Sequence, residues 1–263
     1  MKLKGRETAK VGDRGVELPE PWRSAQMVVV LPTYQEAANL PVIMNVLMEL
    51  PLPGLRVLVV DDNSPDGTGK LAEELADCYG RSRISVVHRQ GKEGLGRAYL
   101  DGMTRAIRSN AEIIVQMDAD LSHGPEYLPG MLGTLLAADA DMVIGSRYVV
   151  GASVGADWPW PRKALSGFAN FYVRSLLRLG IRDVTAGYKM WRASALEALG
   201  LSKVQSNGYS FQVEMNYRAR LRGLKIVELP IHFADRAEGE SKMSLKVQLE
   251  SAVMPFRLRR HVR

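Results

Sequence analysis

The sequence lacks several features that define large classes of protein. It has one cysteine, Cys78, so no internal disulfide can form, which suits a reducing compartment such as the cytosol. No apolar run is long enough to cross a bilayer. The charged N-terminal stretch is not followed by the apolar segment of a cleaved signal peptide. We therefore expect a cytoplasmic protein without a membrane span.

Common nucleotide-binding and hydrolytic motifs are absent as well. The chain has no Gly-x-x-x-x-Gly-Lys-Ser/Thr, which disfavours an NTPase, and no Gly-x-Ser-x-Gly, which disfavours a hydrolase triad. A glycine-rich turn at 91–96 follows the third expected strand and lacks the Gly-x-Gly-x-x-Gly spacing of dinucleotide folds. This turn opens a helix, so Lys92 within it can bring a positive charge to a phosphate.

The formal net charge of +6 calls for an anionic partner. Nucleic acid, acidic lipid and phosphorylated substrates all satisfy that requirement. No platform of interleaved aromatic and basic residues appears, and Trp158 and Trp160 lie among prolines, so we expect no binding to nucleic acid. Tryptophans in such a loop favour contact with a lipid interface over a place in the core.

Short apolar runs rich in β-branched residues alternate with helical patterns in the first half of the chain. Strand and helix alternate five times with short connections, which predicts a mostly parallel α/β sheet flanked by helices. Polar residues follow each strand, so a nucleotide-sized ligand is expected where the carboxyl ends of the strands meet. The predicted strands are 27–31, 55–60, 84–87, a run beginning near Ile113, and 141–144; the predicted helices are 37–50, one that ends near Tyr79, 96–108 and 127–136.

Two carboxylates, Asp118 and Asp120, stand where the apolar run that begins near Ile113 ends. If the chain leaves strand geometry there, both can converge on one cation, and two hard oxygen ligands suit Mg²⁺ or Mn²⁺. Such an ion keeps waters and takes further ligands from a diphosphate. The alternative is that both aspartates only cap the helix that starts near Pro125.

Other polar residues in loops also have two interpretations. Asp62 can accept a hydrogen bond from a base N–H, or it belongs to an ordinary turn in which Asp66 or Thr68 caps the next helix. Basic residues beside Gly, Pro or Trp are solvated in most proteins, but here they can together hold a second anionic group, since arginine bonds two phosphate oxygens at once. These residues are Arg147, Arg162, Lys163 and Arg236.

The second half of the chain is less regular. We expect a loop over 145–165 and helices near 168–179, 193–199 and 211–221, with a strand at 225–227. The domain boundaries that follow are a mobile arm over 1–25, one catalytic domain over 26–243 and a basic amphipathic tail over 244–263. The tail is either a helix packed on the domain with a solvated basic face or a surface membrane anchor.

Several motifs resemble those of the inverting GT-A glycosyltransferases of family 2, and in particular the polyprenyl-phosphate (dolichyl-phosphate) mannose synthases. The resemblance extends from about Met27 to Met243, and the joint set of motifs is specific. The motifs are Pro-Thr-Tyr-Gln-Glu at 32–36, Val-Val-Asp-Asp-Asn-Ser-Pro-Asp-Gly-Thr at 59–68, Asp-Ala-Asp-Leu-Ser-His at 118–123, Gly-Ser-Arg-Tyr at 145–148, Trp-Pro at 158–159 with Arg-Lys-Ala-Leu-Ser at 162–166, Gly-Tyr-Ser-Phe-Gln-Val-Glu-Met at 208–215, and Asp-Arg at 235–236 with Gly-Glu-Ser-Lys-Met at 239–243.

The resemblance implies a role for each matching residue. The metal on the diphosphate would be held by Asp118 and Asp120, with Ser122 standing where some relatives place a ligating glutamine. Chemistry would depend on these aspartates together with Arg147 and Arg236. The nucleotide sugar would contact Pro32, Tyr34, Glu36, Asp62, Lys92, Asp118, Ala119 and Asp120. The acceptor phosphate would contact Arg147, Arg162, Ser166, Arg236 and Lys242, with the loop around Lys242 closing over it.

The implied reaction is inverting transfer of mannose from GDP-mannose to a polyprenyl (dolichyl) monophosphate. Because a lipid monophosphate has a second pKa near 6, the nucleophile arrives mostly deprotonated and needs no general base. Membrane contact on the cytoplasmic face would come from the tail, from the Trp-Pro loop or from a separate transmembrane partner. The alternatives are a UDP-glucose:polyprenyl-phosphate glucosyltransferase and a non-catalytic nucleotide- or lipid-binding subunit.

Overall fold

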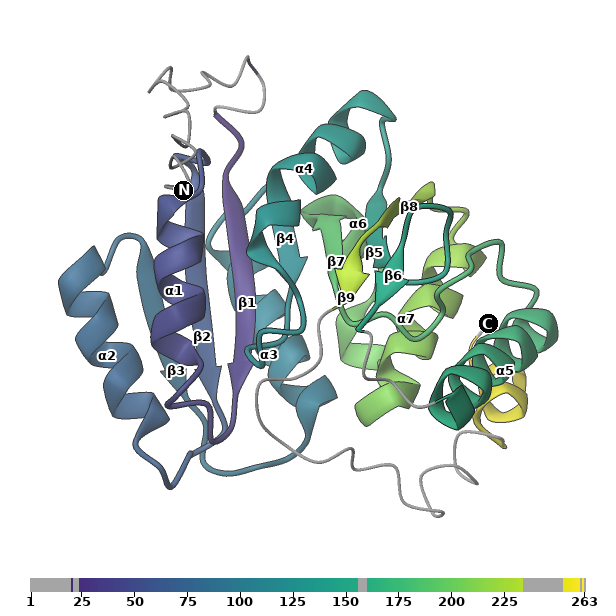
Figure 1. The fold of residues 1–263 in the computed structure, drawn as a ribbon, viewed down its shortest axis with the longest axis horizontal. Helices are drawn as coiled ribbons and strands as arrows, with labels where there is room; N and C mark the ends of the chain where they lie inside the picture. Colours follow the sequence, from purple (N-terminus) through teal and green to yellow (C-terminus); the bar gives the residue numbers. More distant parts are fainter. Residues whose placement is uncertain (1–19, 21–23, 156–159, 234–252, 261, 263) are drawn as a thin grey trace, which may run out of the picture.

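The computed structural model describes residues 20, 24–155, 160–233, 253–260 and 262. A seven-stranded sheet with the order β3-β2-β1-β4-β7-β5-β8 runs through the molecule, and a two-stranded sheet pairs β6 with β9 (Figure 1). The strands are β1 Met27–Thr33, β2 Leu55–Asp61, β3 Ile84–His88, β4 Ile113–Gln116, β5 Met142–Ser146, β6 Ser153–Val154, β7 Lys189–Arg192, β8 Ile226–Pro230 and β9 His232–Phe233. The helices are α1 Leu40–Glu49, α2 Thr68–Tyr79, α3 Leu95–Arg108, α4 Leu128–Ala137, α5 Trp160–Leu177, α6 Ala193–Leu199 and α7 Gly208–Leu221, with 3₁₀ turns η1 Pro125–Tyr127 and η2 Leu201–Lys203.

Apolar side chains alternate between the two faces of the sheet and build two core layers. Along β1, Val28 and Val30 join the layer that includes α3, α6 and α7, whereas Val29 and Leu31 join the layer that includes α1, α2 and α4. Strands with apolar residues on both faces are typical of parallel sheets covered on both sides. The predicted mostly parallel α/β sheet flanked by helices is therefore confirmed.

Strand β7, which lies between β4 and β5, was not predicted from the sequence. It is antiparallel to both, with Gln116 opposite Lys189 and Ile144 opposite Lys189. A four-residue strand with a charged residue at each end, Lys-Met-Trp-Arg, gives no strand-like hydrophobic pattern. Because β7 runs backwards, the loop that precedes it arrives at the same edge of the sheet as the carboxyl ends of β4 and β5.

Several predicted boundaries were wrong. The expected loop over 145–165 contains β6, and α5 already begins at Trp160. Helix α1 begins at Leu40 instead of Ala37, because residues 36–39 form a turn and Pro41 occupies the first turn of the helix, where its missing N–H costs nothing.

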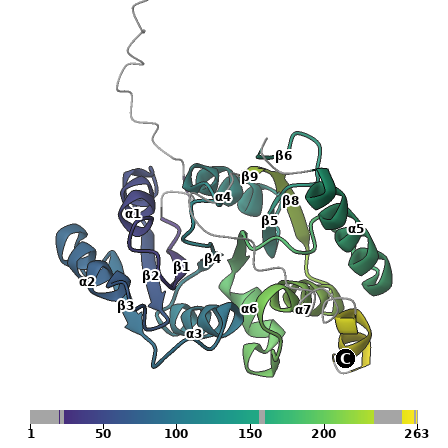
Figure 2. The same cartoon turned by 60° about the horizontal axis from the view of Figure 1, so that its bottom comes forward.

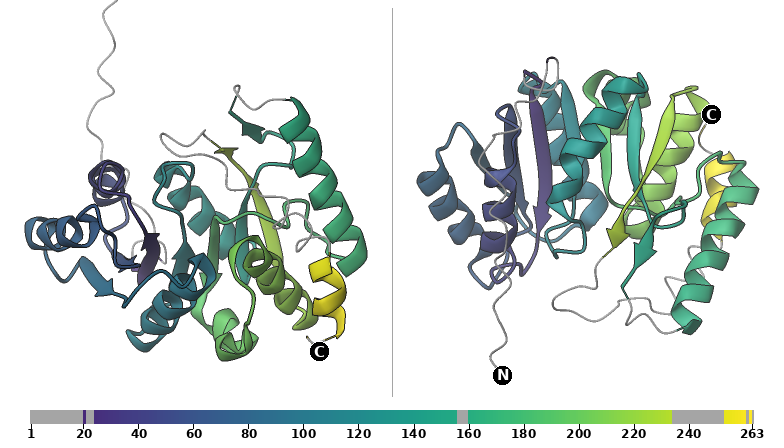
Figure 3. Two further views of the ribbon diagram at one scale, coloured as in Figure 1. Left: turned by 90° about the horizontal axis from the view of Figure 1, so that it is seen from below. Right: turned by 45° about the horizontal axis from the view of Figure 1, so that its top comes forward.

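The end of the chain contributes to the core. Residues 253–260 are helical and lie beside α5 and α7 (Figure 3). Met254, Leu258 and Val262 are buried in the α3–α7 core layer, while Val253 and Phe256 are exposed. Most of the predicted arm, 1–19 and 21–23, and the first part of the tail, 244–252, lie outside the described residues. Among the described helices, none is long and apolar enough to cross a membrane.

Two helical glycines allow a test of how closely helices approach this sheet. A Cβ on Gly102 of α3 would lie 2.3 Å from Val30 Cγ1 and 3.0 Å from Val60 Cγ2, whereas a Cβ on Gly130 of α4 would meet only Leu229 Cδ1 at 3.9 Å. We expect Gly102→Ala to lower the free energy of unfolding by about 1–3 kcal/mol through overpacking. The matched control Gly130→Ala should leave it unchanged or raise it by up to about 1 kcal/mol. Urea unfolding measures both; equal effects would contradict the close approach of α3.

Candidate active site

Polar residues from six strands meet at one edge of the sheet. The carboxyl ends of β1, β2, β3, β4, β5 and β8 share this edge, which is brought forward in Figure 2. The register aligns Thr33 with Asp61 and Asp61 with His88, so β1, β2 and β3 end at the same level. The loops that follow these strands therefore begin side by side. The sequence-based expectation that the strand ends converge is confirmed by this pairing.

The loop after β4 presents Asp118, and two buried side chains hold it. The Tyr99 hydroxyl of α3 donates to Asp118 Oδ1 at 2.5 Å, and the Asp118 N–H donates to His123 Nδ1 at 3.0 Å. Burial and the negative charge of Asp118 raise the pKa of Tyr99 well above its usual value, so the phenol keeps the proton that it donates. His123 is itself fixed by stacking on Tyr188, with ring centroids 5.0 Å apart.

Asp120 is oriented by its own turn. Its Oδ1 accepts from the Ser122 N–H at 3.1 Å and from the Ser122 hydroxyl at 2.5 Å. Leu121 adopts φ 63°, a left-handed conformation that is unusual for a bulky residue and typical of strained functional loops. Ser122 is buried, and both its N–H and its hydroxyl are used to bond Asp120. Its predicted role as a metal ligand stays a prediction.

This loop fits a hard divalent cation. Asp118 and Asp120 offer carboxylate oxygens, and the Asp118 side chain is 24% exposed. Within the described residues, no group of three or more His, Cys, Asp and Glu side chains gathers to enclose a metal by itself. Two carboxylates with open coordination positions suit an ion that also binds water and substrate phosphate, as Mg²⁺ does.

The expected nucleoside side of the edge holds a cation over an aromatic ring and a buried ion pair. Lys92 Nζ lies 3.6 Å from the centre of the Tyr34 ring. Arg89 Nη1 bonds Asp62 Oδ1, and Arg89 Nη2 bonds Glu93 Oε2 at 2.6 Å. Burial raises the pKa of Asp62 above its usual value, and the Arg89 guanidinium opposes that shift. One Asp62 oxygen is thus already engaged, which leaves the other for the predicted contact to a base.

The loops after β1 and β2 are tied to each other. The Glu36 N–H donates to Thr68 Oγ1 at 3.0 Å, and the Ala37 N–H donates to Asp66 Oδ2 at 3.2 Å. Asp66 Oδ1 also accepts from the Thr68 N–H at 3.1 Å, as the turn interpretation expected. Thr33 and Ser64 both donate to the buried Asp61 carboxylate, at 3.0 and 2.6 Å. These hydrogen bonds fix the two loops relative to each other. Pro32 and Ala119, which were predicted to contact the nucleotide sugar, are buried.

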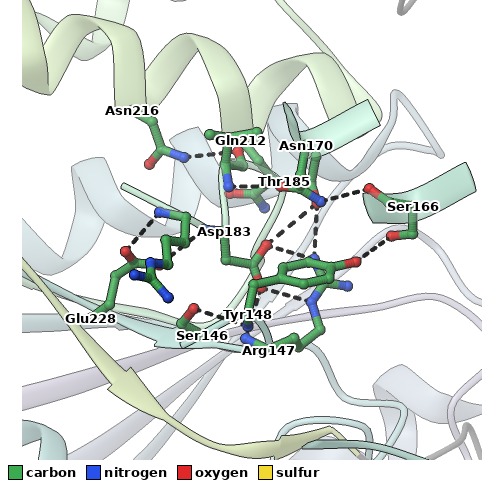
Figure 4. Close-up of polar contacts among 12 residues, drawn as sticks. Ser146, Arg147, Tyr148, Ser166, Asn170, Asp183, Thr185, Gln212, Asn216 and Glu228 are labelled. Carbon is green, nitrogen blue, oxygen red and sulfur yellow. Dashed lines mark hydrogen bonds and ion pairs between the residues drawn. The ribbon is translucent and has the colours of Figure 1, made fainter. Parts of the chain in front are cut away.

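Arg147, the residue after β5, is bound by a buried carboxylate (Figure 4). Its Nε and Nη2 donate to the two oxygens of Asp183, each at 2.8 Å, and Nη2 also donates to Thr185 Oγ1 at 2.8 Å. The next residue, Tyr148, shares a 2.7 Å hydrogen bond with Ser166 of α5. Ser166 is therefore bonded to the residue that follows Arg147, and the roles predicted for Arg147 and Ser166 stay predictions.

Three elements hold the loop that carries Asp183. Glu228 of β8 accepts from the backbone N–H groups of Arg182 and Asp183, at 2.7 and 2.9 Å. Asn170 of α5 accepts from the Val184 N–H at 2.9 Å, and Asn216 of α7 donates to the Val184 carbonyl at 2.8 Å (Figure 4). The orientation of Arg147 therefore depends on contacts from β8, α5 and α7 together.

Not all predicted residues can be placed. Arg162 lies in α5, but its side chain is not described, and Arg236 and Lys242 lie outside the described residues. Conversely, no sequence motif predicted a role for four residues that bond within the site: Tyr99, Arg89, Asp183 and Lys189. Tyr99 precedes Asp118 by 19 positions on another element, so no local motif could indicate their contact.

A buried polar cluster lies next to the loop that carries Asp118 and Asp120, named here the metal loop. Lys189 of β7 is fully buried, and its Nζ donates to Gln212 Oε1 at 2.8 Å. Gln116 Nε2, from the residue opposite Lys189 on β4, donates to the same oxygen at 2.7 Å. Burial lowers the pKa of Lys189 to about 7, and Asp183 opposes that shift.

Several known proteins resemble this chain in sequence. The model of the family described as Glycosyl transferase family 2 matches residues 28–200. A polyprenol monophosphomannose synthase of Mycolicibacterium smegmatis is 48% identical over 217 residues, covering 82% of this chain and 80% of that protein. An undecaprenyl-phosphate mannosyltransferase of Micrococcus luteus is 42% identical over 228 residues, covering 87% of this chain and 91% of that protein.

Among solved structures, the glucosyl-3-phosphoglycerate synthase of Mycobacterium tuberculosis, in complex with Mn²⁺, UDP and glucosyl-3-phosphoglycerate, has a TM-score of 0.62 at 19% identity. The match covers 90% of this chain and 80% of that one and shows a shared fold. The fold and the site define a glycosyltransferase of the GT-A class. The chain belongs to glycosyl transferase family 2.

The contact between Tyr99 and Asp118 generates a prediction about metal affinity. We expect Tyr99→Phe to weaken binding of Mg²⁺ or Mn²⁺ by about 10- to 100-fold, because the ligand carboxylate loses the hydroxyl that orients it. Calorimetric titration of the metal in the presence of GDP measures this. Tyr79→Phe, at an exposed hydroxyl that bonds Asn45, is the matched control. Equal metal affinities in the two variants would show that Tyr99 only fills space.

Proposed function

We propose that this chain transfers mannose from GDP-mannose to a polyprenyl monophosphate, with inversion at the sugar, giving β-mannosyl phosphopolyprenol and GDP. One observation carries the proposal: a pair of carboxylates suited to a metal diphosphate and a fixed arginine lie along one edge of the sheet, in a chain 48% identical to a polyprenol monophosphomannose synthase. This arrangement can bring two anionic substrates together.

The proposed donor site depends on a divalent metal, Mg²⁺ or Mn²⁺, held by Asp118 and Asp120. When bound, such a metal neutralises charge on the diphosphate and stabilises the charge that builds on it as it leaves. Tyr99 and Ser122 orient the two carboxylates before any ligand arrives, so little reorganisation is needed on binding. Tyr34, Glu36, Asp62 and Lys92 remain the residues proposed to hold the nucleoside.

The proposed acceptor site depends on arginine. A lipid monophosphate, with a second pKa near 6, is mostly dianionic at neutral pH and can attack without a general base. Arg147 faces this anion in one fixed orientation because Asp183 holds its Nε and Nη2. Arg162, Arg236 and Lys242 are proposed to add positive charge, and Ser166 to reach the phosphate beside Tyr148.

We propose that α5 brings this site to the membrane that holds the lipid. Trp160, Phe168 and Phe171 recur on one face of the helix and are 78%, 65% and 65% exposed. Ser166 and Asn170 of the same helix contact Tyr148 and the Asp183 loop. Exposed aromatic residues on a helix are typical of interfacial membrane contact. A separate transmembrane partner and a place on the cytoplasmic face stay predictions.

The transfer reaction is tested with radiolabelled sugar nucleotides. We expect label from GDP-mannose, but not from UDP-glucose, to enter an organic-extractable, mild-acid-labile product made from polyprenyl phosphate, and chelator to abolish it. Asp120→Ala should abolish turnover, because the diphosphate loses its cation. Near-normal transfer by that variant at saturating GDP-mannose would contradict the metal assignment, and product formed from UDP-glucose would favour the glucosyltransferase. GDP binding without any transfer would favour a non-catalytic subunit.

The membrane role of α5 is tested with charged substitutions. We expect Phe168→Glu with Phe171→Glu to reduce sedimentation with phosphatidylcholine–phosphatidylglycerol vesicles, and transfer to polyprenyl phosphate within them, by about 10-fold or more, because the apolar contact is lost. Transfer to a short, water-soluble polyprenyl phosphate should stay at the wild-type rate. Val42→Glu, at a 51% exposed apolar residue of α1, is the control. Equal loss with both acceptors would instead indicate damage to the site.

A further inference from the structure

The buried cluster of Lys189, Gln116 and Gln212 has no part in the chemistry described so far. Gln212 lies on α7 and is 4% exposed, and its Oε1 accepts two hydrogen bonds, from Lys189 Nζ at 2.8 Å and from Gln116 Nε2 at 2.7 Å. Lys189 Nζ also reaches the Gln212 backbone carbonyl at 3.3 Å. Three chain segments, β4, β7 and α7, thus meet at one amide.

These contacts decide which way the Gln212 amide points. Lys189 Nζ and Gln116 Nε2 both donate to this amide, so the atom that faces them is the acceptor Oε1. The reversed amide would place N–H groups against Lys189. The Nε2 end therefore points away from the cluster, and it makes no hydrogen bond with the residues that the structure describes.

Nε2 points toward the metal loop. A Cβ built on Gly187 would lie 3.6 Å from Gln212 Nε2, 3.4 Å from Asp118 Oδ2 and 3.1 Å from His123 Cε1. The amide donors and the proposed metal ligand therefore border the same small space. Gly187 keeps that space open because it has no side chain.

We propose that Gln212 is a specificity-determining residue for the donor sugar, whose Nε2 donates a hydrogen bond to one hydroxyl oxygen, and that Lys189 and Gln116 are the positioning residues that aim it. This inference rests on the proposed function, since the sugar next to the metal-bound diphosphate is the ligand that reaches this space. The contact is directional because Oε1 is already engaged: the amide can only donate, so the ligand group must accept.

A substitution that keeps the buried contacts isolates the donor. Gln212→Glu retains an oxygen for Lys189 and for Gln116, but its second oxygen cannot donate to the sugar and can only accept from a hydroxyl. Transfer is measured for GDP-mannose and for a set of analogues that each lack one sugar hydroxyl. We expect the variant to lower kcat/KM for GDP-mannose roughly 10-fold or more. For one analogue, the variant and the wild type should be equal, because that analogue already lacks the contact.

A second variant tests the positioning role. Lys189→Met leaves Gln212 in place but removes one of the two bonds that aim its amide. We expect the preference for GDP-mannose over the same single analogue to fall in this variant as it does in Gln212→Glu. The matched control is Glu214→Gln on α7, whose side chain bonds the N–H groups of Gln205 and Ser206 and the Arg218 guanidinium. Glu214→Gln should lower stability but leave the preference for GDP-mannose over the analogue unchanged.

The outcomes separate this inference from the proposed function. Affinity for GDP without metal, which involves neither the sugar nor the cation, reports that each variant is folded and should match the wild type. If every analogue loses the same factor in wild type and in Gln212→Glu, the hydrogen bond does not exist and the inference is overturned. If the wild type forms no mannosyl lipid, the proposed function fails instead, and the same comparison is made with the sugar nucleotide that the wild type does accept.

Discussion

The structure depends on the hydrogen bonds that hold the carboxylates of the β4 loop in place. Tyr99 and His123 fix Asp118, and Ser122 fixes Asp120. The hydroxyls of Tyr99 and Ser122 each donate to one carboxylate oxygen, and His123 accepts from the Asp118 backbone N–H, so side chains and backbone are both held. A bound cation would then find its ligands already aimed. The strained conformation of Leu121 shows that the surrounding fold imposes this arrangement on the turn.

The reversed strand β7 joins the two halves of the site. Because it runs antiparallel between β4 and β5, it delivers the Asp183 loop to the same edge and places Lys189 beneath the β4 loop. Asp183 then fixes Arg147, for which the sequence predicted a role with phosphate but no partner. One strand therefore links the proposed donor side to the proposed acceptor side. Its first residue, Lys189, is buried because it pairs with β4 on one side and β5 on the other. The hydrogen bonds of the Lys189 cluster offset part of that cost of burial.

Much of the fold followed from hydrophobic pattern. The strands at Met27 and Leu55 and the helices that follow them have strong, uninterrupted periodicity, so their type and order were predicted, with errors of a few residues at their ends. β7 was not predicted, because its stability comes from pairing on both sides and not from its own composition. The start of α5 at Trp160 was also missed, since Pro159 and Pro161 beside it indicated a loop.

The sequence by itself determined the kind of chemistry available: paired aspartates after a buried strand, basic loop residues, and motifs that placed the chain beside a known family. Only the tertiary structure decided which of these groups act together. Tyr99 with Asp118, Arg147 with Asp183 and Arg89 with Asp62 are contacts between different elements. Strand pairing and helix packing set such distances, and they depend on the register of the whole sheet, which no local stretch of sequence records.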